Sequence, residues 1–154
     1  MNRPNVMRGA VWVAGLAAAV LAIAQQAQAA GDPVFGDWLT QTGDGKVRVG
    51  PCAADAAQAC GVVLWLKPPP GVEMQAMRDA NNPDPALRSR ALIGLTLISG
   101  FHREAVGQWA DGQIYDPKSG KTYKAKMALG PNGVLKVAGC VMVFCQAQTW
   151  TKAE

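Results

Sequence analysis

Turn-forming residues recur at short intervals through most of the chain, and their spacing limits what can fold between them. Clusters of Gly, Pro, Asn and Asp leave runs of three to ten residues that are rich in β-branched and aromatic side chains. Runs of this length suit strands and are too short for most helices. The expected strands are residues 36–42, 46–50, 61–67, 92–99, 106–109, 113–115, 121–129, 134–143 and 146–152.

The order of apolar and polar residues within these runs also favours strands. Residues 121–129 alternate between apolar and polar side chains, and this period of two places the two kinds on opposite faces of a strand. Residues 61–66 are apolar throughout, which indicates a strand covered on both faces.

Two dipeptides predict hairpins. Asp111-Gly112 and Asn132-Gly133 are typical of two-residue turns, because both positions accept positive φ. We therefore expect antiparallel hairpins over residues 106–115 and 121–143.

The number of strands favours a closed sheet. An antiparallel meander exposes two edges unless it closes on itself. Eight or nine short strands suit a small closed antiparallel β-barrel whose interior can hold one small ligand, and a β-sandwich is the main alternative. The expected fold is all-β, with one short helical or irregular insertion at residues 71–90.

The first 30 residues have the layout of a secretory signal peptide. Arg3 and Arg8 precede 15 apolar residues at positions 10–24, and a small-x-small pattern predicts cleavage after Ala29 or Ala30. This apolar run is shorter than the ~20 residues that span a membrane. We expect an exported protein, either periplasmic or secreted.

Charge excludes one class of partner. Residues 31–154, which we expect to form a single domain, carry 13 basic and 11 acidic side chains of scattered sign. Such a balance does not predict a nucleic-acid partner, and no run in this part is apolar enough to span a membrane.

Four cysteines follow the predicted signal peptide. An even number of cysteines in an exported protein indicates disulfides, here two. Spacing favours Cys52–Cys60 and Cys140–Cys145 among the three possible pairings. Free thiols and a metal site are the alternatives, and the two spacings do not match a usual zinc site. We expect no metal and no cofactor.

Seven motifs, in order along the chain, resemble an exported bacterial family catalogued as domain of unknown function 2147. The resemblance extends from about residue 36 to residue 152. It implies a lipocalin-like β-barrel in the periplasm and no particular reaction. The motifs are Gly36-Asp-Trp38, Cys60-Gly-Val-Val-Leu-Trp65, Asn81-Asn-Pro-Asp84, Arg88-Ser-Arg90-Ala-Leu-Ile-Gly94, Trp109-Ala-Asp-Gly-Gln-Ile-Tyr-Asp-Pro117, Ser119-Gly-Lys-Thr-Tyr123 and Gln148-Thr-Trp-Thr151.

Gly36-x-Trp38 resembles the signature that opens lipocalin barrels. There the Trp plugs the closed end beneath an Arg of the last strand, and Lys152 stands at the matching position here. A Lys can lie over an indole but lacks the flat guanidinium of Arg. We expect Trp38 and Trp150 to be core plugs.

A catalytic site is not expected. His102 is the only histidine, so any serine–histidine or cysteine–histidine pair depends on it, and its neighbours predict an exposed loop. The predicted disulfides remove the cysteines as nucleophiles. We therefore expect a protein that is not an enzyme.

Aromatic and basic residues are the candidate ligand contacts. Trp65, Tyr115 and Tyr123 lie on expected strands and can line a pocket in the barrel. Arg88 and Arg90 can bind an anionic head group at its mouth.

The same arginines have a structural alternative. They can pair with Asp79 or Asp84 and hold the insertion on the barrel. Residues 79–84 are rich in oxygen ligands, which allows a calcium site, but Asx residues beside proline usually form self-bonded turns.

The leading functional hypothesis is a non-enzymatic barrel that binds a small, partly apolar or amphipathic molecule. The alternative is a cell-envelope interaction module that docks an unknown protein through residues 71–90 while the barrel stays packed. A strip of lysines at positions 118, 121, 124 and 126 is either a solvated face or an attraction for an anionic envelope surface.

The disulfide hypothesis predicts a simple result. Thiol titration of the denatured, unreduced protein should detect no free thiol, because all four cysteines are paired. Detection of four thiols would reject both bridges.

Overall fold

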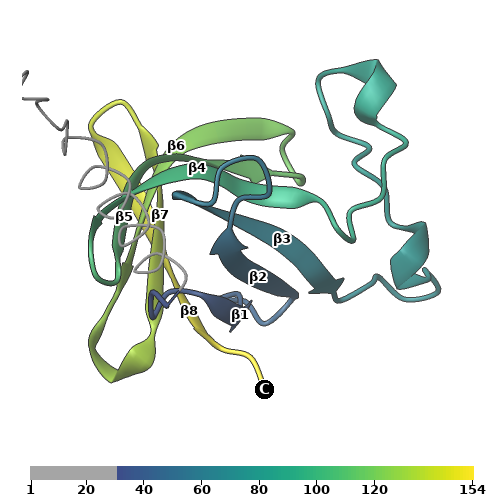
Figure 1. Ribbon diagram of the computed structural model, residues 1–154. Helices are drawn as coiled ribbons and strands as arrows, with labels where there is room; N and C mark the ends of the chain where they lie inside the picture. The colour runs from purple at the N-terminus through teal and green to yellow at the C-terminus, as the bar shows by residue number, and fades with distance from the viewer. Residues whose placement is uncertain (1–30) are drawn as a thin grey trace, which may run out of the picture.

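A computed structural model describes residues 31–154, in which eight antiparallel strands close into one barrel (Figure 1). Each strand pairs with the next, and β1 pairs with β8, so the predicted all-β barrel is confirmed. The predicted signal peptide lies outside the described residues. The strands are β1 (Gly36–Leu39), β2 (Gly45–Pro51), β3 (Gln58–Leu66), β4 (Thr96–Ala105), β5 (Gln108–Asp116), β6 (Lys121–Leu129), β7 (Leu135–Val141) and β8 (Phe144–Lys152).

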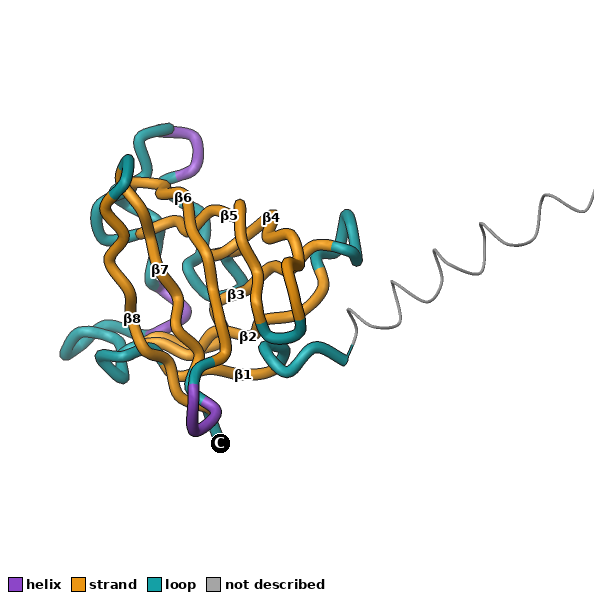
Figure 2. Tube along the Cα trace, turned by 90° about the vertical axis from the view of Figure 1, so that its left-hand side faces the viewer, coloured by secondary structure: helices purple, strands orange, loops and turns teal. Residues whose placement is uncertain are grey.

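The join between β1 and β8 is short. Only Trp38↔Lys152 and Leu39↔Thr151 pair there, because β1 has four residues. Farther along β8, the backbone N–H of Thr149 donates to the side chain of Gln41 at 2.8 Å. Most of β8 is therefore held by β7 alone, as its course along that strand in Figure 2 shows.

Large aromatic side chains fill one end of the barrel, which we call the closed end. Trp38, Phe101, Trp109 and Trp150 are fully buried there. The Trp38 indole N–H donates to the carbonyl of Val34 at 2.8 Å.

Lys152 covers this end. Its Nζ lies 4.0 Å from the centre of the Trp38 ring and donates to the carbonyl of Phe35 at 3.0 Å. A Lys therefore makes the cation–π contact with Trp38 that an Arg makes in the lipocalin pattern.

The opposite end, which we call the open end, is less tightly filled. Tyr123 and Ile114 pair with one another on the inward face and are half-buried. Gln148 pairs with the core residue Val137, so it faces inward, yet its side chain is exposed. Gln148 lies in the middle of β8, so water reaches the inner wall as far as the centre of that strand.

The predicted turn at Asp111-Gly112 is wrong. β5 runs without a break from Gln108 to Asp116, and Asp111 (φ 55°) lies in a β-bulge opposite β6. The bulge requires the same positive φ that a hairpin turn requires. The chain reverses instead just before β5, where Gly107 has a φ of 72°.

The hairpin predicted at Asn132-Gly133 is confirmed, but its turn is longer than the expected two residues, since β6 ends at Leu129 and β7 begins at Leu135. Both residues have positive φ and lie in the turn between β6 and β7, where Pro131–Gly133 forms the 3-10 turn η3.

The strand expected at residues 92–99 starts later and continues farther. Leu92 and Leu95 pack with Val63 in a turn, so β4 begins at Thr96. β4 then includes His102, which corrects the expected loop, although the His102 side chain is exposed.

Both disulfides predicted from spacing are present. Cys52–Cys60 closes the β2–β3 hairpin, and Cys140–Cys145 joins paired residues of β7 and β8. No cysteine of the described part is free. Two disulfides indicate an oxidising compartment outside the cytoplasm.

The interior packing predicts a contrast between two glycines. A Cβ at Gly112 would meet the Phe101 ring, whereas a Cβ at Gly50 would meet nothing within 4 Å. Gly112→Ala should destabilise the protein by about 1–3 kcal/mol through overpacking, and Gly50→Ala should change stability by less than about 0.5 kcal/mol. Urea unfolding measures both, and equal effects would contradict the packing.

Candidate functional site

A buried carboxylate holds the insertion between β3 and β4 against the barrel wall. The Asp79 side chain is 0% exposed. It accepts hydrogen bonds from the Tyr115 hydroxyl (2.6 Å), Asn82 Nδ2 (2.8 Å) and Arg90 Nε (2.8 Å). Tyr115 belongs to β5, whereas Asn82 and Arg90 belong to the insertion. Asp79 therefore links Asn82 and Arg90 within the insertion, and through Tyr115 it also attaches the insertion to the barrel.

The insertion also forms its own turns. The Asn82 side chain accepts from the backbone N–H of Asp84, and the Asp84 side chain accepts from that of Ala86, both at 2.9 Å. The second bond caps η2 (Pro85–Leu87), and a first 3-10 turn, η1 (Met74–Ala76), precedes it. The interpretation of this segment as a self-bonded loop with short helical turns is confirmed.

The hydrogen bonds keep Asp79 charged. Burial favours the neutral acid, but the bonds from Tyr115, Asn82 and Arg90 hold the pKa of Asp79 below its usual value. Burial and the bond to Asp79 raise the pKa of Tyr115. A carboxylate and a neutral phenol therefore meet in this network at neutral pH.

The two arginines of the insertion differ in their contacts. Arg90 forms an ion pair with Asp79, and its guanidinium lies 5.5 Å from the centre of the Tyr115 ring. Arg88 is exposed, and its Nε donates to the carbonyl of Asn82 at 2.8 Å. Arg90 thus pairs with Asp79 and holds the insertion, which is the structural role predicted as the alternative to ligand binding. Arg88 instead donates to a backbone carbonyl.

A pocket of about 290 Å³ lies beside the insertion. We call it the insertion pocket. Arg90 is its only charged lining residue. Its lining residues are Asn82, Pro83, Leu87, Arg90, Thr96, Leu97, Ser99, Gln113, Tyr115, Gly120 and Thr122.

The strand register places this pocket on the outer wall of the barrel. Ile98 pairs with Ile114, and both pack on the core. The adjacent pair, Ser99 and Gln113, must point to the opposite face, because side chains alternate along a strand. The insertion pocket is therefore outside the barrel lumen.

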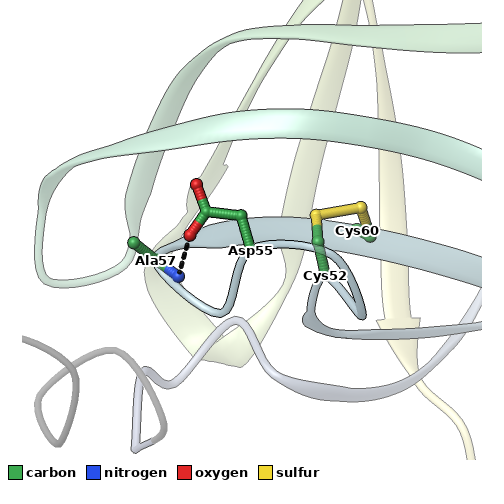
Figure 3. The surroundings of a disulfide bond; sticks show 4 residues. All are labelled: Cys52, Asp55, Ala57 and Cys60. Atoms are coloured by element: carbon green, nitrogen blue, oxygen red, sulfur yellow. Dashed lines mark hydrogen bonds between the residues drawn. A yellow bond between two sulfur atoms is a disulfide. The ribbon is translucent and has the colours of Figure 1, made fainter.

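A second hollow of about 350 Å³ adjoins the first, since Ser99 and Gln113 line both. Its far side is the loop closed by Cys52–Cys60. Figure 3 shows this loop, in which the Asp55 carboxylate accepts from the backbone N–H of Ala57 at 3.0 Å.

The structure separates the five ligand contacts expected from sequence. Tyr115 and Arg90 line the insertion pocket, and Arg88 does not. Tyr123 pairs with the inward-facing Ile114, so it faces the lumen. Trp65 is half-buried near the end of β3 and lines neither hollow.

Sequence reasoning missed the pocket residues on the strands. Ser99 and Gln113 reach the outer wall beside bulges at Gly100 (φ 69°) and Asp111. A bulge changes which face the following residues occupy. The one available signal is a glycine beside each residue, Gly100 after Ser99 and Gly112 before Gln113, because a glycine at a strand often marks a bulge.

Comparison with known proteins assigns the chain to a family. Residues 36–152 match the model of a family described as "Uncharacterized protein conserved in bacteria (DUF2147)". The chain belongs to this family. A search of curated proteins found no match.

A solved structure shares the fold. It is protein HP1028 from the human pathogen Helicobacter pylori, described as belonging to the lipocalin family. The similarity has a TM-score of 0.66 at 21% identity and covers 79% of this chain and 83% of that one. The barrel is therefore lipocalin-like. Among residues 31–154, no helix has the length and apolar character needed to cross a membrane.

The buried carboxylate predicts a pH dependence. Because the pKa of Asp79 is lowered on folding, its stabilisation is present above the unfolded-state pKa of about 4 and is lost as the pH falls through the folded-state pKa. Asp79→Asn should be less stable than the wild type by about 2 kcal/mol at pH 7.

That difference should shrink below about pH 4, where the wild-type carboxylate takes up a proton. Urea unfolding of both proteins between pH 7 and pH 3 measures it. A difference that stays constant over this range would show that the charge of Asp79 does not stabilise the fold.

Proposed function

We propose that this chain is an exported, non-enzymatic, lipocalin-like protein that binds one small, partly apolar molecule in the insertion pocket. The observation that carries the proposal is the pocket itself, whose outer side is an insertion held by the ion pair between Arg90 and the buried Asp79. Its volume is at the lower end of the range for small-molecule sites. A pre-formed wall of this kind reduces the ordering that binding requires.

The lining indicates the chemistry of the ligand. Leu87 and Leu97 offer apolar surface, while Ser99 and Gln113 offer polar groups. Arg90 uses Nε and Nη2 for Asp79, and within residues 31–154 its Nη1 group has no protein partner. A molecule with a short apolar part and a carbonyl or carboxylate oxygen, placed toward Nη1, suits this arrangement.

Export to the periplasm or beyond the cell is part of the proposal. The two disulfides support an oxidising compartment, and the signal-peptide pattern supports export. The non-enzymatic assignment rests on the lipocalin-like fold and on His102, whose exposed side chain lines neither hollow.

Native mass spectrometry of protein purified from its own cells tests the proposal. Ser99→Trp places an indole where the two hollows meet, and it should abolish bound mass by filling the pocket. Thr149→Trp is the matched control, because Thr149 is an exposed position of β8 that lines neither hollow.

We expect bound mass in the wild type and in Thr149→Trp but not in Ser99→Trp, with similar thermal unfolding for all three. A wild-type protein that never carries bound mass would overturn the proposed function. Bound mass that persists in Ser99→Trp would overturn the location of the site.

A further inference from the structure

The turn between β7 and β8 carries four consecutive apolar residues that are exposed to solvent. The exposed fractions are 57% for Val141, 92% for Met142, 84% for Val143 and 80% for Phe144. We call these residues the apolar tip, and it lies at the upper left of Figure 1. A group of large apolar side chains exposed in this way usually marks an interaction surface.

The backbone of the apolar tip is also unusual. Met142 has a φ of 54°, in a region that favours Gly, Asn or Asp. Two-residue hairpin turns normally use those residues. Met142 therefore has a backbone conformation that is unfavourable for its residue type, and it also exposes a large apolar side chain to water. Two such departures at one residue indicate a functional role.

A disulfide constrains the base of the apolar tip. Cys140 and Cys145 pair across β7 and β8, and their bridge encloses the four residues of the tip. The tip is thus ordered before it meets a partner, so binding loses less conformational entropy.

Two lysines supply positive charge beside this bridge. Lys124 pairs with Cys140, and Lys126 lies two residues farther along β6, roughly 7 Å away. Both are exposed, both are on the outer face, and neither forms an ion pair within the described residues. In the turn between β5 and β6, by contrast, Lys118 forms an ion pair with Asp44.

We infer that the apolar tip inserts into the interface of an anionic lipid membrane while Lys124 and Lys126 contact the head groups. Val141 and Phe144 pair on the face that continues the lumen side, whereas Met142 and Val143 form the turn itself. Apolar groups that point in several directions suit a lipid interface, which surrounds them. A groove on a protein takes mainly one face.

Vesicle sedimentation tests this inference directly. The exported protein, with both disulfides intact, is mixed with vesicles of 30% phosphatidylglycerol and 70% phosphatidylethanolamine, or with pure phosphatidylcholine. We expect binding to the anionic vesicles and at least tenfold weaker binding to the neutral ones. High salt should weaken the anionic binding, because it screens the lysines.

Substitutions separate the two contributions. Phe144→Ser should reduce binding about tenfold through lost apolar contact. Lys124→Gln with Lys126→Gln should reduce it about 25-fold, at roughly fivefold per lysine. The matched control is Val106→Ser, which removes an apolar residue that is 68% exposed at the closed end and should leave binding unchanged.

Met142→Asn distinguishes a functional tip from a structural one. Asn tolerates positive φ, so this change should raise the melting temperature by about 3 °C while it weakens vesicle binding. Lower stability would assign Met142 a structural role and count against the inference.

Absence of anionic-vesicle binding by the wild type, or equal loss in the Val106→Ser control, would overturn the membrane assignment. If the wild type instead crosslinks to an envelope protein, and Phe144→Ser abolishes that band without vesicle binding in either protein, the tip is a protein contact. Small-molecule binding can succeed or fail independently, because it is read by bound mass and by Ser99→Trp.

Discussion

The placement of the insertion depends on the charge of one buried side chain. Asp79 is fully buried, and its carboxylate is stable there because Tyr115, Asn82 and Arg90 all donate to it. A buried charge without such partners is strongly unfavourable. The network therefore specifies one position for the insertion relative to β5, and it also orients Arg90. The insertion pocket exists because this position is maintained.

The interior of the barrel explains why the candidate site is on the wall. Trp38, Phe101, Trp109 and Trp150 fill the closed end, as side chains do in small barrels. Bulges in β4 and β5 then shape the outer face, on which Ser99 and Gln113 connect two hollows. The insertion pocket therefore lies outside the lumen, between the sheet and an insertion.

The apolar tip and the insertion belong to the same end of the barrel, because both follow strands that run toward it. Each is held by a local restraint, which is a disulfide for the tip and the ion pair of Arg90 with the buried Asp79 for the insertion. The two features nonetheless lie on opposite sides of the molecule in Figure 1, because the tip joins β7 and β8 whereas the insertion follows β3 and covers the outer face of β4 and β5. The two proposals rest on different residues, so each can be tested without the other.

Local sequence determined most of the strands, the hairpin at Asn132-Gly133 and both disulfides, because alternation, turn chemistry and short cysteine spacing act between near neighbours. The self-bonded loop was predictable for the same reason. Asp111-Gly112 was misread, since a bulge and a turn need the same positive φ, and only pairing with β6 distinguishes them. Only the tertiary structure decided that Tyr115 faces the insertion while Tyr123 faces the lumen. The direction of each side chain depends on strand register and on bulges, and pairing with strands distant in the sequence sets both.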